Sequence, residues 1–227
     1  MPVPARLPEI VVKASRVVYL HGFASSAGST KAAWFAERLL GHDVAFDCPD
    51  FNEPEFVTLT LTRMVDQLGA HLARIDGPVT LIGSSLGGTL AVLAAEPFKQ
   101  TVDRIVLLAP AVMFAKPGHH LLPPERVDEW RARGALPFFH YSYGEERPLG
   151  YSFYEDSLRY NAFDAIVSQP TLVFQGLRDA SVDYRTVEAF ARTRPNVTLS
   201  LLDDDHQLIA SLTRIWDGVA DFLELHE

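Results

Sequence analysis

A serine within a glycine-framed turn is the feature of this sequence that most directly predicts chemistry. Ser85 stands at the centre of the G-x-S-x-G pattern Gly83-Ser84-Ser85-Leu86-Gly87, between an apolar run and a segment of small residues. In such a turn the serine takes strained backbone angles, and glycines two residues to either side avoid a collision with neighbouring backbone. The pattern predicts Ser85 as a nucleophile supported by Gly83 and Gly87; the alternative is a purely structural tight turn.

A serine hydroxyl needs a base to remove its proton, and that base needs a carboxylate to orient it. Asp179 follows the apolar run 171–174, and His206 follows the run 197–202. Both are therefore expected beyond the carboxyl ends of parallel strands, where ligand-handling groups collect, in the chain order Ser, Asp, His. We expect His206 as the general base and Asp179 as the acid. Asp183 is the nearest substitute for Asp179, whose alternative role is that of a helix N-cap.

Two backbone N–H groups are expected to hold the oxyanion of a tetrahedral intermediate. One belongs to Leu86, directly after the nucleophile, and the other to Phe23, in the loop after the first apolar run. Gly22 allows that loop to turn sharply. We expect His21 to hold the loop by hydrogen bonds rather than to act as a second base.

Short runs rich in Val, Ile and Leu alternate with segments of helical spacing along the chain. This alternation predicts an α/β fold in three layers, a mostly parallel sheet with helices on both faces. One helix is expected from Ser29 or Thr30 to Gly41, a second around 61–75 with an uncertain start, and a last one with an apolar stripe over 208–222. The expected strands are 16–20, 43–46, 79–82, 104–108, 171–174 and 197–202.

The segment from about 112 to 163 breaks this rhythm, because it has no good buried strand and is rich in proline and aromatic residues. A structureless loop of that length is unusual in a compact domain, so we expect an inserted, partly helical cap within a single domain spanning 1–227. Its aromatic residues are expected to line an apolar pocket for neutral acyl or aryl groups, or alternatively to pack the cap onto the body. The pocket candidates are Trp130, Phe138, Phe139, Tyr143, Tyr151 and Tyr154.

Arginines in the same segment offer another reading of the cap. They are candidates to meet a carboxylate, or a phosphate of a thioester carrier, although scattered arginines are more often solvated. The four are Arg126, Arg131, Arg133 and Arg147.

Composition and charge exclude several classes of partner. The 227 residues carry 20 Lys and Arg against 29 Asp and Glu, a net charge of -9, so neither nucleic acid nor an anionic membrane surface is expected to bind. We see no secretory signal and no apolar stretch of membrane-spanning length. The only cysteine, Cys48, excludes an internal disulfide and suits a cytoplasmic location. No cluster at ligand spacing predicts a metal, and no organic cofactor is expected.

The motifs taken together resemble the α/β-hydrolase superfamily: His21-Gly22-Phe23 after one strand, Gly83 to Gly88 after another, then Asp179 and His206. More narrowly, the pairing of His21-Gly22-Phe23-Ala24-Ser25-Ser26 with Gly83 to Gly88 resembles the small YqiA-like bacterial esterases. The resemblance implies an α/β-hydrolase fold and a serine carboxylesterase that acts on simple acyl esters.

The same triad also serves other acyl substrates, because fold and triad do not fix the substrate. The alternatives are acyl thioesters, amide or peptide bonds and carbon–carbon bonds, and less favoured is a catalytically silent ligand-binding module. The expected partner is therefore a small-molecule ester or thioester. The sequence does not indicate an oligomeric state.

Overall fold

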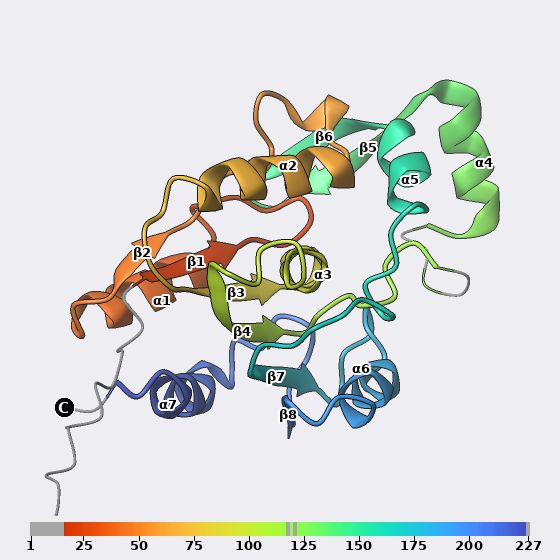
Figure 1. Ribbon diagram of the computed structural model, residues 1–227. Coiled ribbons are helices and arrows are strands. Elements are labelled where there is room, and N and C mark those ends of the chain that lie inside the picture. Colours follow the sequence, from red (N-terminus) through yellow and green to blue (C-terminus); the bar gives the residue numbers. More distant parts are fainter. Residues whose placement is uncertain (1–15, 117–118, 120–121, 226–227) are drawn as a thin grey trace, which may run out of the picture.

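A parallel six-stranded sheet, in the order β2-β1-β3-β4-β7-β8, forms the centre of the molecule (Figure 1). The computed structural model describes residues 16–116, 119 and 122–225. Each strand expected from the sequence is present, with ends that differ by a few residues. The strands are β1 (Arg16–Leu20), β2 (Ala45–Asp47), β3 (Val79–Ser84), β4 (Val102–Leu108), β7 (Thr171–Gly176) and β8 (Val197–Leu202).

Helices cover both faces of this sheet, as the alternating pattern predicts. Successive strand residues point to opposite faces, so Val17 and Tyr19 belong to the core under α1 and α7, whereas Val18 and Leu20 belong to the core under α2 and α3. The core that contains Val18 and Leu20 also includes residues of α6. The helices are α1 (Thr30–Leu40), α2 (Leu61–Leu72), α3 (Leu86–Ala94), α6 (Tyr184–Arg192) and α7 (Leu212–Phe222).

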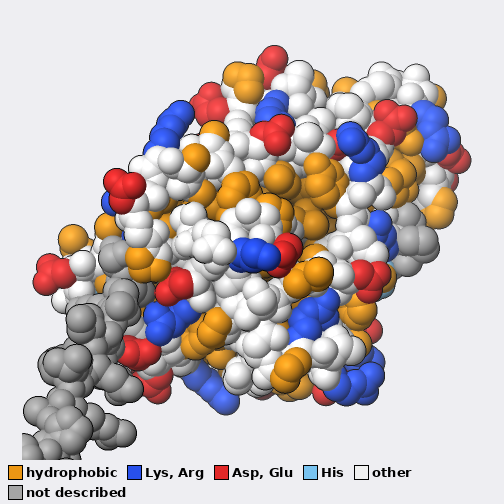
Figure 2. All heavy atoms as spheres, in the orientation of Figure 1, with side chains coloured by type: hydrophobic (Ala, Val, Ile, Leu, Met, Phe, Trp, Pro, Cys, Tyr) orange, Lys and Arg blue, Asp and Glu red, His pale blue; other side chains and the backbone are white. Residues whose placement is uncertain are grey.

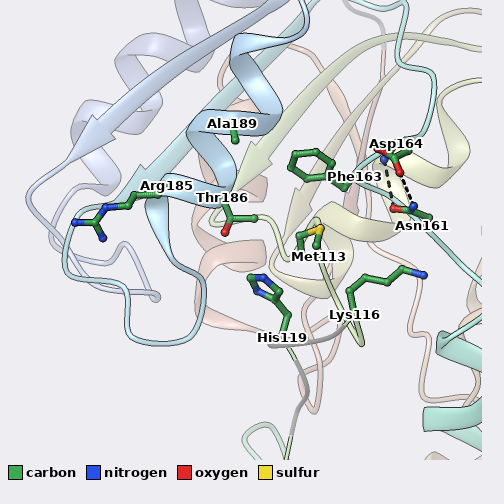
Figure 3. A pocket seen from close by; sticks show the side chains of 9 residues that line it. All are labelled: Met113, Lys116, His119, Asn161, Phe163, Asp164, Arg185, Thr186 and Ala189. Carbon is green, nitrogen blue, oxygen red and sulfur yellow. Dashed lines mark hydrogen bonds between the residues drawn. The ribbon is translucent and has the colours of Figure 1, made fainter.

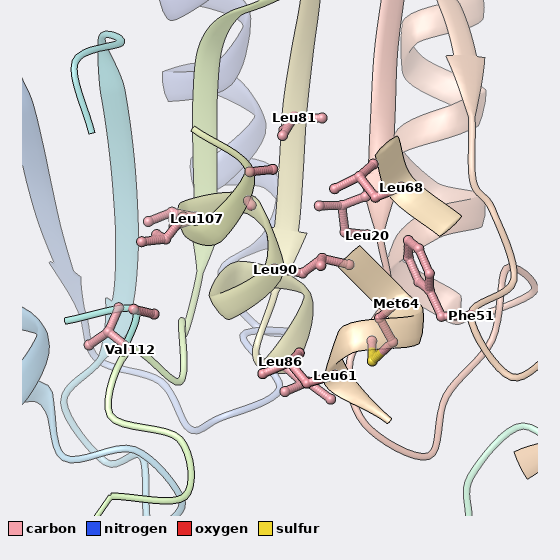
Figure 4. Packing of buried hydrophobic residues seen from close by; sticks show 14 of the residues in the cluster. Leu20, Phe51, Leu61, Met64, Leu68, Leu81, Leu86, Leu90, Leu107 and Val112 are labelled. Atoms are coloured by element: carbon pink, nitrogen blue, oxygen red, sulfur yellow. The ribbon is translucent and has the colours of Figure 1, made fainter. Parts of the chain in front are cut away.

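The larger core joins the sheet to α2, α3 and the segment after β4. Figure 4 shows its middle, where Leu20 and Leu81 of the strands meet Leu68 of α2 and Leu90 of α3. The space-filling view shows hydrophobic side chains gathered in a band below α2, while acidic and basic side chains are interspersed over the face drawn (Figure 2). Burial of apolar side chains at these helix–sheet contacts holds the three layers together.

Two helix boundaries differ from the sequence pattern for local reasons. The ambiguous stretch 56–62 forms a short 3-10 helix, η1 (Phe56–Thr58), before α2, whose first turn is capped by the Thr60 hydroxyl. The apolar stripe over 208–222 is only partly helical. Leu208 is buried but has φ 57°, which ends the preceding turn, and α7 begins at Leu212.

The segment between β4 and β7 is partly helical, as expected, but it also contains an antiparallel hairpin that the sequence pattern missed. Its elements are α4 (Pro124–Arg133), β5 (Ala135–His140), β6 (Glu145–Gly150) and α5 (Ser152–Ser157). Pro137 faces Pro148 across the hairpin, and a proline within a run argues against a buried central strand; β6 is also mostly charged and exposed. Of the expected cap and domain, residues 1–15, 117–118, 120–121 and 226–227 lie outside the described residues.

Candidate active site

Ser85 lies on a sharp turn between β3 and α3. Its backbone angles are φ 53° and ψ -113°, outside the regions that side chains normally allow. Its N–H donates to the Leu108 carbonyl at 2.9 Å, which fixes the turn against β4. A Cβ added to Gly83 would overlap the Gly87 carbonyl, and one added to Gly87 would overlap the Leu20 carbonyl. Glycine at both positions is therefore required by the close approach of backbone to backbone.

The side chains of Ser85, His206 and Asp179 form a continuous hydrogen-bonded row. Ser85 Oγ is 3.0 Å from His206 Nε2, and His206 Nδ1 is 2.8 Å from Asp179 Oδ2. The three residues follow the carboxyl ends of β3, β8 and β7. The Asp179 side chain is fully buried, whereas a fifth of the His206 side chain is exposed. This geometry lets Nε2 accept the serine proton while Nδ1–H donates to the carboxylate.

Hydrogen bonding decides the charge state of Asp179. Burial by itself raises the pKa of this carboxyl, but hydrogen bonds from His206 and the Val182 N–H, the charge of His206 and a hydrogen bond from Gln175 outweigh burial. The pKa of Asp179 therefore lies below its ordinary value, and the group is ionised at neutral pH. An ionised carboxylate in this position stabilises an imidazolium on His206.

Asp183, the nearest substitute for Asp179, has a different place. It is the N-cap of α6, and its Oδ1 accepts from the Arg185 N–H at 3.0 Å. The helix-capping role considered for Asp179 thus belongs to Asp183.

Two residues at the end of β7 support this row without belonging to any motif in the sequence. Gln175 is fully buried, and its Nε2 donates to Asp179 Oδ2 at 2.9 Å. A Cβ on Gly176 would lie 2.5 Å from the Asp204 carbonyl, so the missing side chain lets the loop that carries His206 approach β7. Their only signal in the sequence is their position, directly after the apolar run 171–174.

The amides expected to hold an oxyanion are both available. Neither the Phe23 N–H nor the Leu86 N–H donates to another residue in the described part of the chain. Gly22 brings the first loop against the turn: its Cβ position lies 3.5 Å from Ser85 Cβ. His21, which is buried, holds the same loop, since its Nδ1 is 2.9 Å from the Gly22 carbonyl oxygen. This arrangement places unpaired backbone donors next to the serine.

The loop after β1 is also tied to the hairpin. Asn52 Nδ2 donates to the Ser25 carbonyl at 2.7 Å, and the Tyr141 N–H donates to the Ala24 carbonyl at 2.8 Å. His140 Nε2 lies 3.3 Å from Asn52 Oδ1. Asn52 is buried and joins three segments that are distant in sequence, which is why the sequence did not single it out.

A cleft of about 1050 Å³ opens beside Ser85 and His206. Its apolar lining comes mainly from the segment after β4 and from the hairpin, and its polar lining mainly from the loop before α1, the hairpin turn and the loops after β7 and β8. The apolar residues are Phe23, Leu86, Ala111, Met113, Phe114, Leu122, Phe138, Phe139, Ala180, Val182 and Ile209. The polar ones include Ser25, Ser29, Thr30, Lys31, Tyr141, Ser142, Ser181 and Gln207.

Only part of the predicted aromatic pocket lines this cleft. Phe138 and Phe139 do so. For the other four residues the structure corrects the prediction: the described lining of the cleft does not include Trp130, Tyr143, Tyr151 and Tyr154.

The four aromatic residues outside the cleft pack within their own segment. Trp130 is fully buried, and its indole N–H donates to the Leu149 carbonyl at 2.8 Å. Tyr151 and Tyr154 pack against the Trp130 ring, and Tyr143 lies at the exposed hairpin turn. Trp130, Tyr151 and Tyr154 belong to the larger core, so these rings pack the segment onto the body, which is the alternative considered for the cap.

The arginines of this segment also lie outside the described lining of the cleft. Each forms an ion pair with a nearby carboxylate at the surface. Arg126 and Arg133 pair with Glu129, Arg131 pairs with Asp128, and Arg147 pairs with Glu145. These arginines therefore lie at the solvated surface, which is the second of the two roles considered for them from the sequence.

A smaller pocket of about 480 Å³ adjoins the cleft, with which it shares Met113, His119 and Thr186. In Figure 3 the Arg185 guanidinium points away from Met113 and Phe163. The smaller pocket extends the cleft on the side of Met113. Its other lining residues are Lys116, Asn161, Asp164 and Ala189.

Other reactive groups do not form a second centre. Burial and the charge of Asp50 raise the pKa of the Cys48 thiol to about 12, which leaves it unreactive. Within residues 16–116, 119 and 122–225, no group of three or more His, Cys, Asp or Glu side chains is placed to hold a metal ion. No helix in the same part of the chain has the length and apolarity to cross a membrane.

The sheet order, the flanking helices and the serine turn define the α/β-hydrolase fold. Residues 16–223 match the family UPF0227, described as an uncharacterised protein family, and the chain belongs to this family. No curated protein gave a significant match.

Solved structures with the same fold cover nearly the whole chain. A putative hydrolase from Agrobacterium vitis S4 has a TM-score of 0.81 at 22% identity, over 92% of this chain and 87% of that one. Est1E from Butyrivibrio proteoclasticus with ferulic acid bound has a TM-score of 0.79 at 21% identity, over 94% and 90%. Alpha/beta hydrolase domain-containing protein 10 from mouse has a TM-score of 0.74 at 21% identity, over 92% and 89%.

Proposed function

We propose that this protein is a serine hydrolase that cleaves carboxylic esters of small, largely apolar acyl groups through an acyl-enzyme. One observation carries the proposal. Ser85 Oγ, His206 and the ionised Asp179 are joined by contacts of 3.0 and 2.8 Å, beside two unpaired backbone N–H groups. This combination of nucleophile, base, acid and oxyanion donors is what acyl transfer requires.

In the first half of the proposed reaction, Ser85 Oγ attacks the ester carbonyl carbon and its proton passes to His206 Nε2. Asp179 stabilises the imidazolium, and the N–H groups of Phe23 and Leu86 donate to the oxyanion. The carbon–oxygen bond to the alcohol then breaks, and His206 gives its proton to the leaving oxygen. In the second half, water attacks the acyl-enzyme by the same proton route and releases the acid and free Ser85.

The apolar lining of the cleft supports a largely apolar acyl group, because burial of hydrocarbon there is favourable. Est1E has the same fold, and its solved structure holds ferulic acid, which is a carboxylic acid. Thioesters, amides and carbon–carbon bonds use the same groups, so a substrate series with one acyl group and varied leaving groups distinguishes them.

Replacement of the nucleophile tests the proposal. Ser85→Ala should lower kcat/KM for p-nitrophenyl butyrate by about 10⁶, the scale seen when such a serine is removed. It should also abolish labelling by a fluorophosphonate probe. Ser168→Ala, at an exposed serine, is the matched control and should keep both activities. Labelling that persists in Ser85→Ala would contradict the assignment, and folded wild-type protein that neither hydrolyses nor labels would favour a ligand-binding module.

A further inference from the structure

We propose that the polar side of the cleft binds a carboxylate or phosphate carried by the alcohol part of the ester, with the ammonium group of Lys31 as the cation. This inference rests on the proposed function and names the substrate class of the same site. The observations concern the position of Lys31, its unpaired charge and the lining around it.

Lys31 lies in the first turn of α1 and lines the cleft beside Ser85. Its Nζ donates to the carbonyl of Gln207, the residue after His206, at 3.0 Å. His206 must return its proton to the leaving oxygen, so the alcohol part of an ester has to lie on the His206 side of Ser85. Lys31 is therefore placed to meet the alcohol part rather than the acyl part.

The charges of Asp179, Asp204 and Asp205 act on Lys31 from a distance, without a direct contact among the described residues. No carboxylate of the described residues forms an ion pair with it. Nearby carboxylates have other partners: Asp204 Oδ2 accepts from a backbone N–H at 2.8 Å, and Asp205 Oδ1 accepts from the Gln207 N–H at 2.8 Å. Since an ammonium group has three N–H donors and Gln207 takes one, two remain for a ligand.

The lining around Lys31 suits an anion. Among the described residues that line the cleft, Lys31 is the one Lys or Arg, and none is Asp or Glu. Several hydroxyl groups of this lining donate to no described residue and are free to solvate an anion. They belong to Ser25, Thr30, Tyr141, Ser142 and Ser181.

Burial has a cost for this lysine that an anionic ligand would offset. It lowers the pKa of Lys31 to about 8, against the opposing charges of Asp205, Asp179 and Asp204. At pH 7 the ammonium group is still mostly protonated. Among the described residues no carboxylate is in direct contact with this partly desolvated cation, and a carboxylate or phosphate at hydrogen-bond distance would lower the cost of its burial.

Matched esters test the proposal at pH 7. The pair 4-acetoxybenzoate and 4-acetoxybenzamide differs in the charge of the alcohol part, and 4-acetoxyphenyl phosphate tests a phosphate source. We expect kcat/KM to favour the charged esters by about tenfold. Lys31→Met should lose that preference and Lys31→Arg should keep it. Lys99→Met, which removes a charge from a surface ion pair, is the matched control and should also keep it.

Two results of this series would overturn the proposal. If Lys31→Met slows the charged and neutral esters by one common factor, Lys31 only positions the His206 loop and the proposal is wrong. An equal preference for a charged acyl part, measured with monophenyl succinate against phenyl butyrate, would contradict the assignment to the alcohol side. Circular dichroism checks folding, and Lys31→Gln replaces Lys31→Met if the latter does not fold.

A binding measurement separates this proposal from the proposed function. Calorimetric titration of Ser85→Ala with 4-hydroxybenzoate and 4-hydroxybenzamide needs no hydrolysis. Tighter binding of the carboxylate, lost in the double variant with Lys31→Met, supports the anion site even if the wild type hydrolyses no ester. Equal affinities for the two compounds overturn the anion site whatever the activity.

Discussion

Asp179 is the residue whose surroundings most narrowly define the chemistry of the site. Its Oδ1 accepts from the Ser181 and Val182 N–H groups, both at 2.8 Å, and its Oδ2 faces His206 and Gln175. With both oxygens satisfied, the carboxylate cannot rotate away from His206. It therefore sets which nitrogen of the imidazole carries the proton, and so which nitrogen faces Ser85.

Replacement of this carboxylate should disable the base without removing it. In Asp179→Asn the amide can donate to His206 Nδ1 and favour the tautomer with a proton on Nε2, so kcat for p-nitrophenyl butyrate should fall by about 10⁴. Asp183→Asn is the matched control, because Asn also caps helices well and Asp183 caps α6. A large loss in Asp183→Asn, with activity kept in Asp179→Asn, would exchange the two assignments.

At the scale of elements, the β5–β6 hairpin contacts the loop that follows β1. Its turn contacts the loop after β1 through the Tyr141 N–H, and its last β5 residue, His140, contacts Asn52. The Phe23 ring packs against Phe138 of the hairpin, with 5.6 Å between ring centroids. The loop that carries the Phe23 N–H, the proposed oxyanion donor, is thus held from the side of the cap as well as from the sheet.

Removal of the Asn52 side chain should loosen this loop. Asn52→Ala leaves the Ser25 carbonyl without its partner, so we expect the free energy of unfolding to fall by about 1–3 kcal/mol and kcat to fall about tenfold as the Phe23 N–H loses its position. Urea titrations and ester kinetics measure the two effects. Asn196→Ala loses two side-chain hydrogen bonds, against three in Asn52→Ala, and they lie before β8, at the opposite edge of the sheet. It should lower stability alone, and an equal loss of kcat in both variants would contradict the loop argument.

At the scale of the whole molecule, hydrogen-bonded carboxylates link stability to pH. Burial raises the pKa of Asp50, but hydrogen bonds from His21 and Asn52 outweigh it, and the pKa of Asp179 is lowered in the same manner. A carboxyl with a lower pKa in the folded state binds fewer protons there than in the unfolded chain. Its stabilising contribution is present above the ordinary carboxyl pKa of about 4 and is lost as the pH falls through the folded value.

The free energy of unfolding should therefore decrease as the pH falls from 5 to 3, and Asp50→Asn should flatten that decrease. Urea titrations at several pH values measure the slope. Asp103 is the control of opposite sign, because burial raises the pKa of its carboxyl. Its folded form binds protons more readily than the unfolded chain, so Asp103→Asn should not flatten the decrease. A slope that is the same in wild type and Asp50→Asn would contradict the prediction.

The local pattern of the sequence was sufficient for much of the fold and of the candidate site. Apolar runs mark β3 and β7 because buried parallel strands have both faces covered. The spacing of Gly83, Ser85 and Gly87 marks the serine turn because the steric demand is local. The hairpin gave no such signal, since its strands carry Pro137 and Pro148 and β6 is mostly exposed.

The sequence by itself determined the layered sheet and which serine, carboxylate and histidine follow its strands, because these depend on contacts within a turn or on the period of one element. Only the tertiary structure decided what surrounds them. It placed Lys31 in the cleft, removed Trp130 from it and joined Asn52 to two distant loops. Such contacts link residues far apart in the chain. A local sequence pattern reports the spacing of neighbouring residues, so it cannot predict a partner that is distant in the chain.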